Sequence, residues 1–366
     1  MLRLLLVICV WLLPVVVQAQ VISSQKGALT LTKMADGFRT PWALAFLPDG
    51  SFLVTEREGK LWQVTPQGKK RQIKGLPNVA VQNQGGLLDV MVPRDFENRR
   101  ELFLSYSKKQ GGGAGTAVAR ATLKANSNRL SDVRQIFEMT PGSKGGRHFG
   151  SRIVEARDGT LFVTLGERGD RPSAQDLGRH NGSIIRITRT GAVPADNPFV
   201  SNAAAQPEIW SYGHRNPQGA ALDRNGNLWA VEHGAKGGDE VNRIRAGRNY
   251  GWPVISYGTH YSGAKIGEGT SKSGLEQPRF FWDPSIAPSG LMIYSGKLWP
   301  EWRGNMFVGS LKFDFISRLS GSKLSERERL KSDETARVRD IREAPDGAIW
   351  FIAEDKGAIF RISPRD

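Results

Sequence analysis

The segment from Arg147 to Arg152, RHFGSR, places a histidine beside glycines and directly before the apolar pair Ile153-Val154. This residue, His148, is one of only five histidines in the chain. An imidazole held at the entrance of a strand can act as a general base, because its pKa lies near neutrality. In such a setting, however, a histidine is most often a polar loop residue without a chemical role. The choice depends on which other side chains lie around it.

Other segments between apolar stretches carry cations that could surround this histidine: Arg215, Lys312, Arg337 and Arg339. If these loops meet at one end of the molecule, they form a basic channel around His148. Such a channel favours a small polyanion, especially one whose carboxylates an arginine can meet in two places. The alternative is that each cation pairs with an acidic neighbour, for example Arg339 with Asp340 or Asp346.

A glycine-rich segment from Glu232 to Tyr250 contains the acidic pair Asp239-Glu240. Carboxylates and exposed main-chain carbonyls are oxygen ligands that suit a hard cation such as calcium. The segment is not an EF-hand, because the alternating oxygen ligands and terminal glutamate of that loop are missing. By itself this pattern is a weak signal for a metal.

The segments that position these loops repeat one unit. The unit begins with an apolar stretch, continues through a turn of the Asp-Gly or Asn-Gly type, and ends in a strand rich in aromatic and β-branched residues. Such turns allow a positive φ and predict two-residue hairpins. Four clear copies and two weaker ones occur at 42–55, 153–164, 220–231, 341–352, 87–106 and 291–310. Six hairpin units with almost no helical periodicity predict an all-β, six-bladed β-propeller whose functional loops surround a central channel. A large β-sandwich or two smaller β domains are the alternatives.

The first nineteen residues have the features of a signal peptide. Arg3 precedes an apolar run from Leu4 to Val17, and small residues stand at the −3 and −1 positions of a cleavage site after Ala19. We therefore expect an exported, periplasmic protein whose residues 20–366 form a single propeller domain. The only cysteine, Cys9, lies in this leader, so the mature chain would have no disulfide, thiolate nucleophile or zinc–sulfur site.

The formal net charge is +15, but the basic residues are scattered and show no aromatic-basic RNA signature. We therefore expect no nucleic-acid partner. Beyond the leader no segment reaches eighteen apolar residues, so we expect no membrane span.

Taken in order, several motifs make the chain resemble the soluble quinoprotein sugar dehydrogenases: QGGLLDV, HFGSR, SYGHRNPQG, GGDEVN followed by NYGWP, and RVRDI with APDG. The closest branch is the periplasmic aldose sugar dehydrogenases, which use pyrroloquinoline quinone (PQQ) and calcium. The resemblance extends from about Gly37 to Ser363, nearly the whole mature chain. Each motif alone is modest, but their shared order is specific.

The resemblance implies that His148 is the general base. It also implies a set of cofactor-binding residues: Gln84, Arg215, Asn216, Lys312, Arg337 and Arg339, with Tyr261 at the border of the same pocket. Main-chain carbonyls of Gly234 and Ala235 would bind the calcium that contacts the quinone. A further calcium would bind Glu240 and Tyr250, the latter through its backbone oxygen.

With these assignments, the implied reaction is oxidation of an aldose sugar at C1 to a lactone, with transfer of a hydride to the quinone and then to an external electron acceptor. The three carboxylates of PQQ would explain the basic channel, and calcium would polarise the quinone. Glu167, at the end of the strand that follows His148, is a candidate to orient and charge-stabilise the imidazole.

The chain departs from the family pattern at two places. Ala235-Lys236 stands where the family often has a proline, which puts the stiffness of the calcium loop in doubt. In Trp282-Asp283-Pro284-Ser285 a carboxylate stands where glucose-specialised relatives have an aromatic wall, which predicts an open, permissive sugar site. The alternatives in function are a metal-dependent lactonase-type hydrolase and a non-catalytic propeller that binds protein or glycan at its rim.

Overall fold

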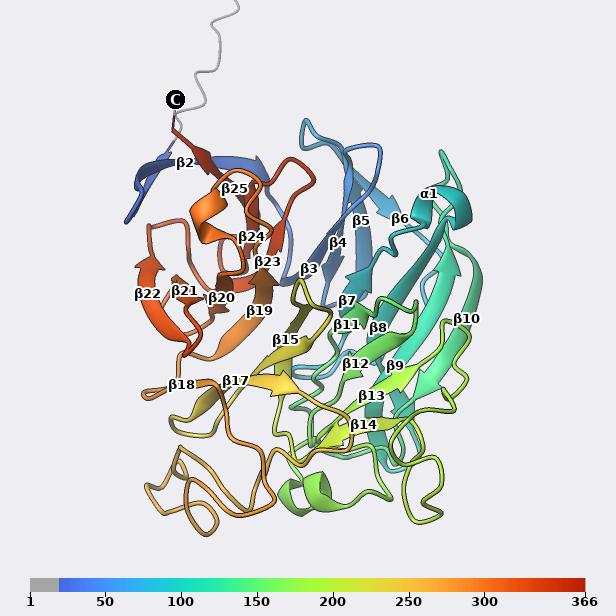
Figure 1. Cartoon of the computed structure of the whole chain (residues 1–366). Coiled ribbons are helices and arrows are strands. Elements are labelled where there is room, and N and C mark those ends of the chain that lie inside the picture. The colour runs from blue at the N-terminus through green and yellow to red at the C-terminus, as the bar shows by residue number, and fades with distance from the viewer. Residues whose placement is uncertain (1–19, 366) are drawn as a thin grey trace, which may run out of the picture.

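The computed structural model describes residues 20–365, which fold into six antiparallel sheets arranged as a β-propeller (Figure 1). The predicted six-bladed, all-β fold is confirmed. Each of the six predicted hairpin units supplies the first two strands of one sheet. The proposed leader, residues 1–19, lies outside the described residues. Within the described part of the chain, no helix is long and apolar enough to cross a membrane.

Five of the sheets are meanders of four consecutive strands. Their strands are β3 (Pro41–Phe46), β4 (Phe52–Glu56), β5 (Lys60–Val64) and β6 (Lys70–Ile73); β7 (Leu87–Met91), β8 (Glu101–Gln110), β9 (Gly113–Thr122) and β10 (Ser131–Glu138); β11 (Ile153–Glu155), β12 (Leu161–Thr164), β13 (Ser183–Ile187) and β14 (Ile209–Tyr212); β15 (Pro217–Leu222), β16 (Leu228–Glu232), β17 (Asp239–Ile244) and β18 (Phe280–Trp282); β19 (Pro288–Ile293), β20 (Met306–Ser310), β21 (Ile316–Ser320) and β22 (Ser325–Leu330).

The sixth sheet joins the two ends of the chain and closes the ring. Its strands, in spatial order, are β23 (Val338–Glu343), β24 (Ile349–Ala353), β25 (Ala358–Pro364), β2 (Gly27–Ala35) and β1 (Gln20–Ser24). Pairing of β2 with β25 therefore replaces an open sheet edge by a continuous ladder. All five residues of β24 are buried, because both of its faces pack against apolar side chains.

The helical segments are short and lie in the links between strands. They are α1 (Phe96–Arg99), η1 (Arg171–Gln175) and η2 (Pro300–Trp302). The link between β17 and β18 is the longest connection between consecutive strands. The entrances to the first strands of the sheets and the links between second and third strands lie at one end of the propeller. The hairpin turns between first and second strands lie at the opposite end, as antiparallel meanders require.

The hairpin turns differ from the predicted two-residue type. Leu47 donates its N–H to Ser51 O at 2.8 Å and accepts from Gly50 N at 3.1 Å, so the loop has three residues. Gly50 has φ 79°, the left-handed residue that restores the strand twist after a type I turn. The same pattern of hydrogen bonds recurs at 156–160, 223–227 and 344–348. The turn residues were recognised correctly, but the loop length was not.

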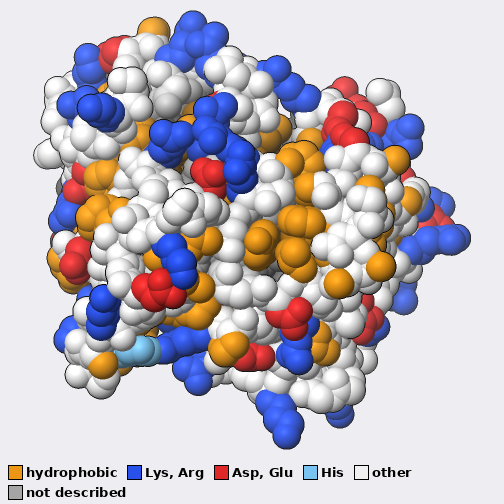
Figure 2. Space-filling view, turned by 60° about the horizontal axis from the view of Figure 1, so that its bottom comes forward, with side chains coloured by type: hydrophobic (Ala, Val, Ile, Leu, Met, Phe, Trp, Pro, Cys, Tyr) orange, Lys and Arg blue, Asp and Glu red, His pale blue; other side chains and the backbone are white. Residues whose placement is uncertain are grey.

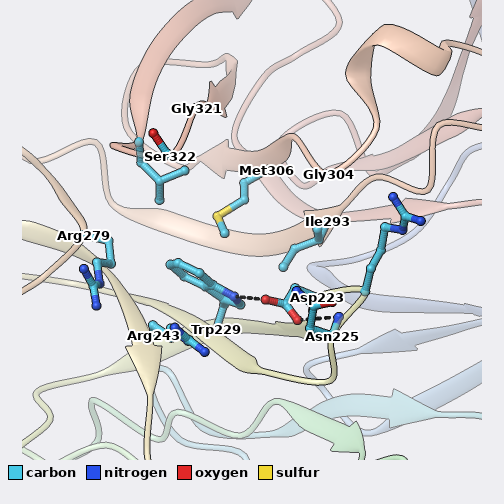
Figure 3. A pocket seen from close by; sticks show the side chains of 12 residues that line it. Asp223, Asn225, Trp229, Arg243, Arg279, Ile293, Gly304, Met306, Gly321 and Ser322 are labelled. Atoms are coloured by element: carbon cyan, nitrogen blue, oxygen red, sulfur yellow. Dashed lines mark hydrogen bonds between the residues drawn. The ribbon is translucent and has the colours of Figure 1, made fainter.

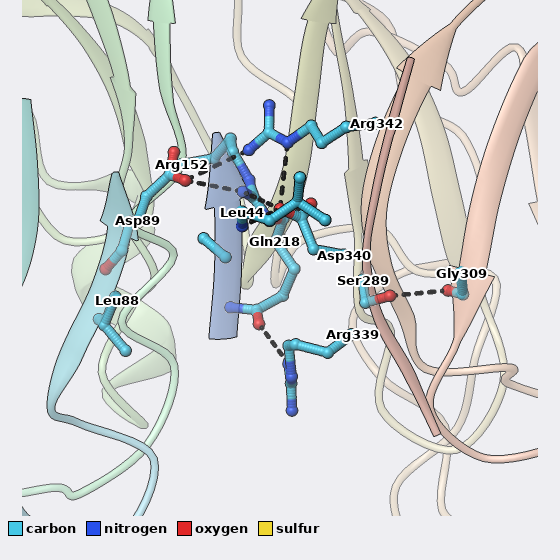
Figure 4. Close-up of polar contacts among 12 residues, drawn as sticks. Leu44, Leu88, Asp89, Arg152, Gln218, Ser289, Gly309, Arg339, Asp340 and Arg342 are labelled. Carbon is cyan, nitrogen blue, oxygen red and sulfur yellow. Dashed lines mark hydrogen bonds and ion pairs between the residues drawn. The ribbon is translucent and has the colours of Figure 1, made fainter. Parts of the chain in front are cut away.

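A buried ion network joins side chains at the first strands of three sheets, β7, β11 and β23 (Figure 4). Arg152, directly before β11, contacts Asp89 Oδ1 through Nη1 at 2.8 Å and Asp340 Oδ1 through Nη2 at 3.2 Å. Arg342 bonds the same two carboxylates at 3.3 and 3.0 Å. The guanidinium of Arg152 also lies 4.7 Å from the ring centroid of Trp42. Side chains from β3, β7 and β23 thus meet that of Arg152 in the middle of the ring.

Candidate active site

His148 lies on the loop before β11 with φ 55°, in the left-handed region that non-glycine residues seldom adopt. Its Nδ1 is 2.5 Å from Glu167 Oε1, and its main-chain N–H donates to Gln84 Oε1 at 2.8 Å. His148 is 8 % exposed and Glu167 is 1 % exposed. The structure therefore brings together three residues that the sequence assigned to one site.

The environment keeps this imidazole neutral. Burial is the largest influence and lowers the pKa of His148 below its ordinary value; nearby Arg215 acts in the same direction, and Glu167 opposes it. Because Nδ1 faces a carboxylate, it carries the ring proton, and Nε2 is left with a free lone pair. A neutral imidazole in this tautomer can accept a proton through Nε2.

Two adjoining cavities lie at the same end of the propeller. The inner one has a volume of about 90 Å³, and its lining includes Gln84, Asn216, Arg337 and Arg339. The outer one has a volume of about 750 Å³, and its lining includes Gly234, Ala235, Tyr261, Lys312 and Arg337. Loops from four sheets thus meet as the sequence predicted. On the face at the bottom of Figure 1, lysine and arginine side chains gather beside acidic ones (Figure 2).

The arginines of the inner cavity are held in place by one shared carboxylate. Glu354 Oε2 accepts from Arg339 Nε at 2.6 Å and lies 3.3 Å from Arg337 Nε. The alternative in which Arg339 pairs with Asp340 or Asp346 is wrong. Both acids are engaged elsewhere, Asp340 with Arg152 and Arg342, and Asp346 with Arg361. Arg337 Nε also lies 4.0 Å from Oδ1 of the exposed Asp355, at the limit of ion-pair distance, and a single buried carboxylate between two guanidiniums leaves the inner cavity cationic.

The other two cations lack such a partner. No carboxylate among the described residues lies within ion-pair distance of Arg215 or Lys312. Arg215 is 6 % exposed, stacks 5.3 Å from the ring of Trp252 and donates to His233 O at 3.3 Å. A buried, unpaired guanidinium beside a cavity is suited to an anionic ligand.

A third, smaller hollow of about 20 Å³ is lined by Glu232, Glu240 and Tyr250. Burial first, and then the charge of Glu232, raises the pKa of Glu240 to about 8. Asn242 Nδ2 donates to both carboxylates, and its own Oδ1 is buried without a partner. The phenol of Tyr250 is engaged by Arg243 O at 2.6 Å, so only its main chain is available. Buried oxygens with excess negative charge fit a hard cation.

The loop at Gly234 and Ala235, which the sequence predicts to bind calcium, is hydrogen-bonded to neighbouring segments although it lacks the family's proline. Lys236 and Thr259 exchange two main-chain hydrogen bonds of 3.0 Å, and Gly238 donates to Trp282 O at 2.9 Å. A Cβ on Gly234 would lie 2.1 Å from Gly237 O, so the turn is tightly folded. Hydrogen bonds to Thr259 and Trp282 thus restrain the loop where the family's proline is missing.

Comparisons with known proteins assign the chain to a family. The family model described as "Glucose / Sorbosone dehydrogenase" matches residues 38–361. This chain belongs to that family. It is 40 % identical to "Aldose sugar dehydrogenase YliI" of Escherichia coli K12, covering 97 % of this chain and 98 % of the relative.

Solved structures of family members have the same architecture. The apo-form of the soluble aldose sugar dehydrogenase from Escherichia coli superposes with a TM-score of 0.89 at 40 % identity, over 92 % of this chain and all of that one. The PQQ-bound form of an aldose sugar dehydrogenase from Streptomyces coelicolor has a TM-score of 0.77 at 26 % identity, over 92 % of this chain and 98 % of that one.

Sequence reasoning missed one residue in this dehydrogenase, His233. It borders all three cavities of the site. Its Nε2 donates to Pro288 O at 2.8 Å, and burial together with Arg215 lowers its pKa to about 3. It is therefore a permanently neutral ring with Nδ1 as acceptor. The sequence signal for it is its position directly before Gly234, the glycine predicted to bind calcium.

The mouth of the outer cavity is lined by Asp283 and by Tyr261, whose side chain is exposed. The carboxylate predicted for the sugar side of the site is thus at the entrance. Another hollow, of about 590 Å³, lies at the opposite end of this dehydrogenase beside Trp229 and Asp223 (Figure 3). Asp223 is fully occupied there by Trp229 Nε1 and neighbouring amides. None of the predicted site residues lines that hollow.

Proposed function

We propose that the protein oxidises aldose sugars at C1 to lactones with PQQ and calcium. The observation that carries the proposal is the buried His148–Glu167 pair beside a cavity lined by Arg337 and Arg339. The relatives from Escherichia coli and Streptomyces coelicolor, both aldose sugar dehydrogenases and the latter solved with PQQ bound, support the same function.

The residues present fit this cofactor. Its carboxylates would be held by the cationic set Arg215, Lys312, Arg337 and Arg339, with Gln84, Asn216 and Tyr261 beside them. The carbonyls of Gly234 and Ala235 would bind the calcium, and the hollow at Glu240 and Tyr250 would hold a further one. When bound, the quinone supplies the hydride acceptor and calcium makes it more electrophilic.

The protein's own chemistry is proton transfer. Nε2 of His148 accepts the proton of the anomeric hydroxyl, because Nδ1 is already committed to Glu167. Glu167 stabilises the resulting imidazolium and fixes the ring orientation. Loss of this proton together with the hydride of C1 converts the hemiacetal to a lactone. Arg215 beside His148 favours the neutral ring before the reaction begins.

We further propose that the enzyme is exported to the periplasm and passes its electrons to an external acceptor. The lactonase alternative would need several acidic or histidine side chains around one cation. Within residues 20–365, no group of three or more such residues is placed to hold a metal. Nothing in the site favours that alternative or a purely binding role.

Reconstitution tests the proposal. Protein made without the cofactor should be inactive, and PQQ with calcium should restore reduction of an artificial dye by several aldoses. A chelator present during reconstitution should prevent the recovery, and nicotinamide cofactors should not replace the quinone. Absence of dye reduction with every aldose, despite saturating quinone and calcium, would overturn the assignment. Lactone hydrolysis with metal alone would instead indicate a hydrolase.

Calcium binding in the small cavity beside Glu240 can be tested separately. Burial and the charge of Glu232 raise the pKa of Glu240 to about 8, so glutamine resembles its protonated form, and the cofactor-free Glu240→Gln variant should melt no lower than wild type near neutral pH. Calcium at about 100 times its Kd should stabilise wild type by roughly 2.7 kcal/mol. That stabilisation should be reduced in the variant, and differential scanning calorimetry with and without calcium measures both effects. An equal calcium response in the two proteins would show that Glu240 is not a ligand.

A further inference from the structure

The loop that carries His148 is interlocked with the loop that carries Glu167. A Cβ on Gly166 would lie 2.1 Å from His148 O, and a Cβ on Gly145 would lie 2.4 Å from Arg168 O. The two loops therefore touch backbone to backbone at positions where only glycine fits. This close approach holds Glu167 against the imidazole of His148.

Arg168, the residue after Glu167, fixes the histidine loop on both sides of His148. Its guanidinium donates to the carbonyls of Gly145 and Arg147, and to Ala114 O at 3.4 Å. It also lies 3.3 Å from the ring centroid of Phe149. One planar group thus binds the residue before the histidine and covers the side chain of the residue after it.

The charge of Arg168 has no ordinary counter-ion. The side chain is 1 % exposed, and no described carboxylate lies within ion-pair distance of it. Burial lowers the pKa of Arg168 to about 9, which leaves it protonated at neutral pH. A buried cation that bonds only carbonyls and an aromatic ring is costly in desolvation, whereas an apolar side chain could fill the same space. A fork with several donors can fix several carbonyls at once, which an apolar residue cannot do.

The backbone at His148 needs such support. Its φ of 55° is unfavourable for a residue with a Cβ and persists only where the surroundings hold it. We propose that Arg168 is the positioning residue of this site: it fixes the main chain from Gly145 to Phe149, so that Nδ1 of His148 stays on Glu167 and Nε2 faces the sugar. The proposal rests on the function of His148 proposed above.

Arg168→Ala tests the role in the reconstituted enzyme. The expected result is a fall in kcat of about 10- to 100-fold, typical of a misplaced catalytic group, with KM and quinone affinity changed less than about twofold. Added methylguanidinium should restore part of kcat in this variant and none in His148→Gln. Arg168→Lys keeps the charge but loses the planar fork, and it should lie between wild type and Arg168→Ala.

A measurement on the cofactor-free protein separates this proposal from the proposed function. Amide hydrogen exchange at 145–150 should be faster in Arg168→Ala, while exchange in β12 and β13 stays unchanged. Arg318 provides a matched control, because it is 6 % exposed and lies 5.2 Å from the ring of Trp302 on another sheet. Arg318→Ala should lower stability but leave kcat and exchange at 145–150 unchanged.

Unchanged kcat and unchanged exchange in folded Arg168→Ala or Arg168→Lys would overturn the positioning role. Loss of kcat in proportion to the unfolded fraction, as in a purely structural variant, would overturn it as well. A wild-type enzyme that is inactive with quinone and calcium would refute the proposed function, and the exchange experiment would still decide whether Arg168 holds the loop.

Discussion

Replacing His148 by glutamine should lower kcat by roughly 10²- to 10⁴-fold, the range for loss of a general base, while the protein still binds PQQ. Glutamine is close to histidine in size and can still bond Glu167, but its amide cannot accept a proton near neutral pH. Steady-state dye reduction gives kcat, and a quinone titration gives the affinity. Wild-type-like kcat in this variant would return His148 to the role of a polar loop residue.

The direction of the pKa shift adds a pH test. A base works when it is unprotonated, so activity is lost as pH falls through its pKa in the folded protein. Burial lowers the pKa of His148. The midpoint of the acidic limb in the pH profile of kcat/KM should therefore lie below 6.5, the ordinary pKa of histidine. This limb should disappear in His148→Gln.

His180 is a matched control for this substitution. It is also buried and lies 3.2 Å from a carboxylate, Glu208, but it borders none of the cavities of the site. His180→Gln should therefore lower stability without a large change in kcat. A comparable loss of kcat in both variants would show that general destabilisation, not base removal, explains the effect.

Replacing Arg152 by alanine should destabilise the fold by about 3–5 kcal/mol, the usual cost of removing one partner from a buried ion pair. Arg152 is 1 % exposed and bonds both Asp89 and Asp340. Without it the two carboxylates share only Arg342, and one buried charge is left uncompensated. The midpoint and slope of chemical unfolding give the change in free energy of unfolding.

Arg361 serves as the control for the ion network. It pairs with Asp346 at 2.9 Å, but both side chains are partly solvent-exposed. Arg361→Ala should therefore cost about 1 kcal/mol or less. If Arg152→Ala were no more destabilising than Arg361→Ala, the network would not contribute to closing the ring.

The sequence predicted the architecture because the information for it is local. The unit around Asp49-Gly50 and its five relatives shows where each hairpin turns, and six such units predict six blades. The three-residue length of the turns was not predicted, because Asp-Gly serves equally in two-residue turns. Only the hydrogen bonds of Leu47 with Gly50 and Ser51 distinguish the two.

The predicted site residues could be named from motifs, and Glu167 could be named as the neighbour of His148, but the partners of the arginines could not be predicted. Pairing of Arg339 with the nearby Asp340 or Asp346 was the alternative to a basic channel, and the structure pairs Arg339 with Glu354 instead. His233 and Arg168 were overlooked, since their roles depend on Pro288 and on the carbonyls of another loop.

What the sequence determined by itself was the number of blades, the cationic character of the loops and the membership of a dehydrogenase family. What only the tertiary structure decided was which charges meet. Arg152 and Asp340 are 188 residues apart and form one network at the axis. Closure of the ring brings such residues together, and no periodicity or spacing along the chain records a contact between the sheet that begins with β11 and the sheet that contains β23, which forms only once all six sheets are in place.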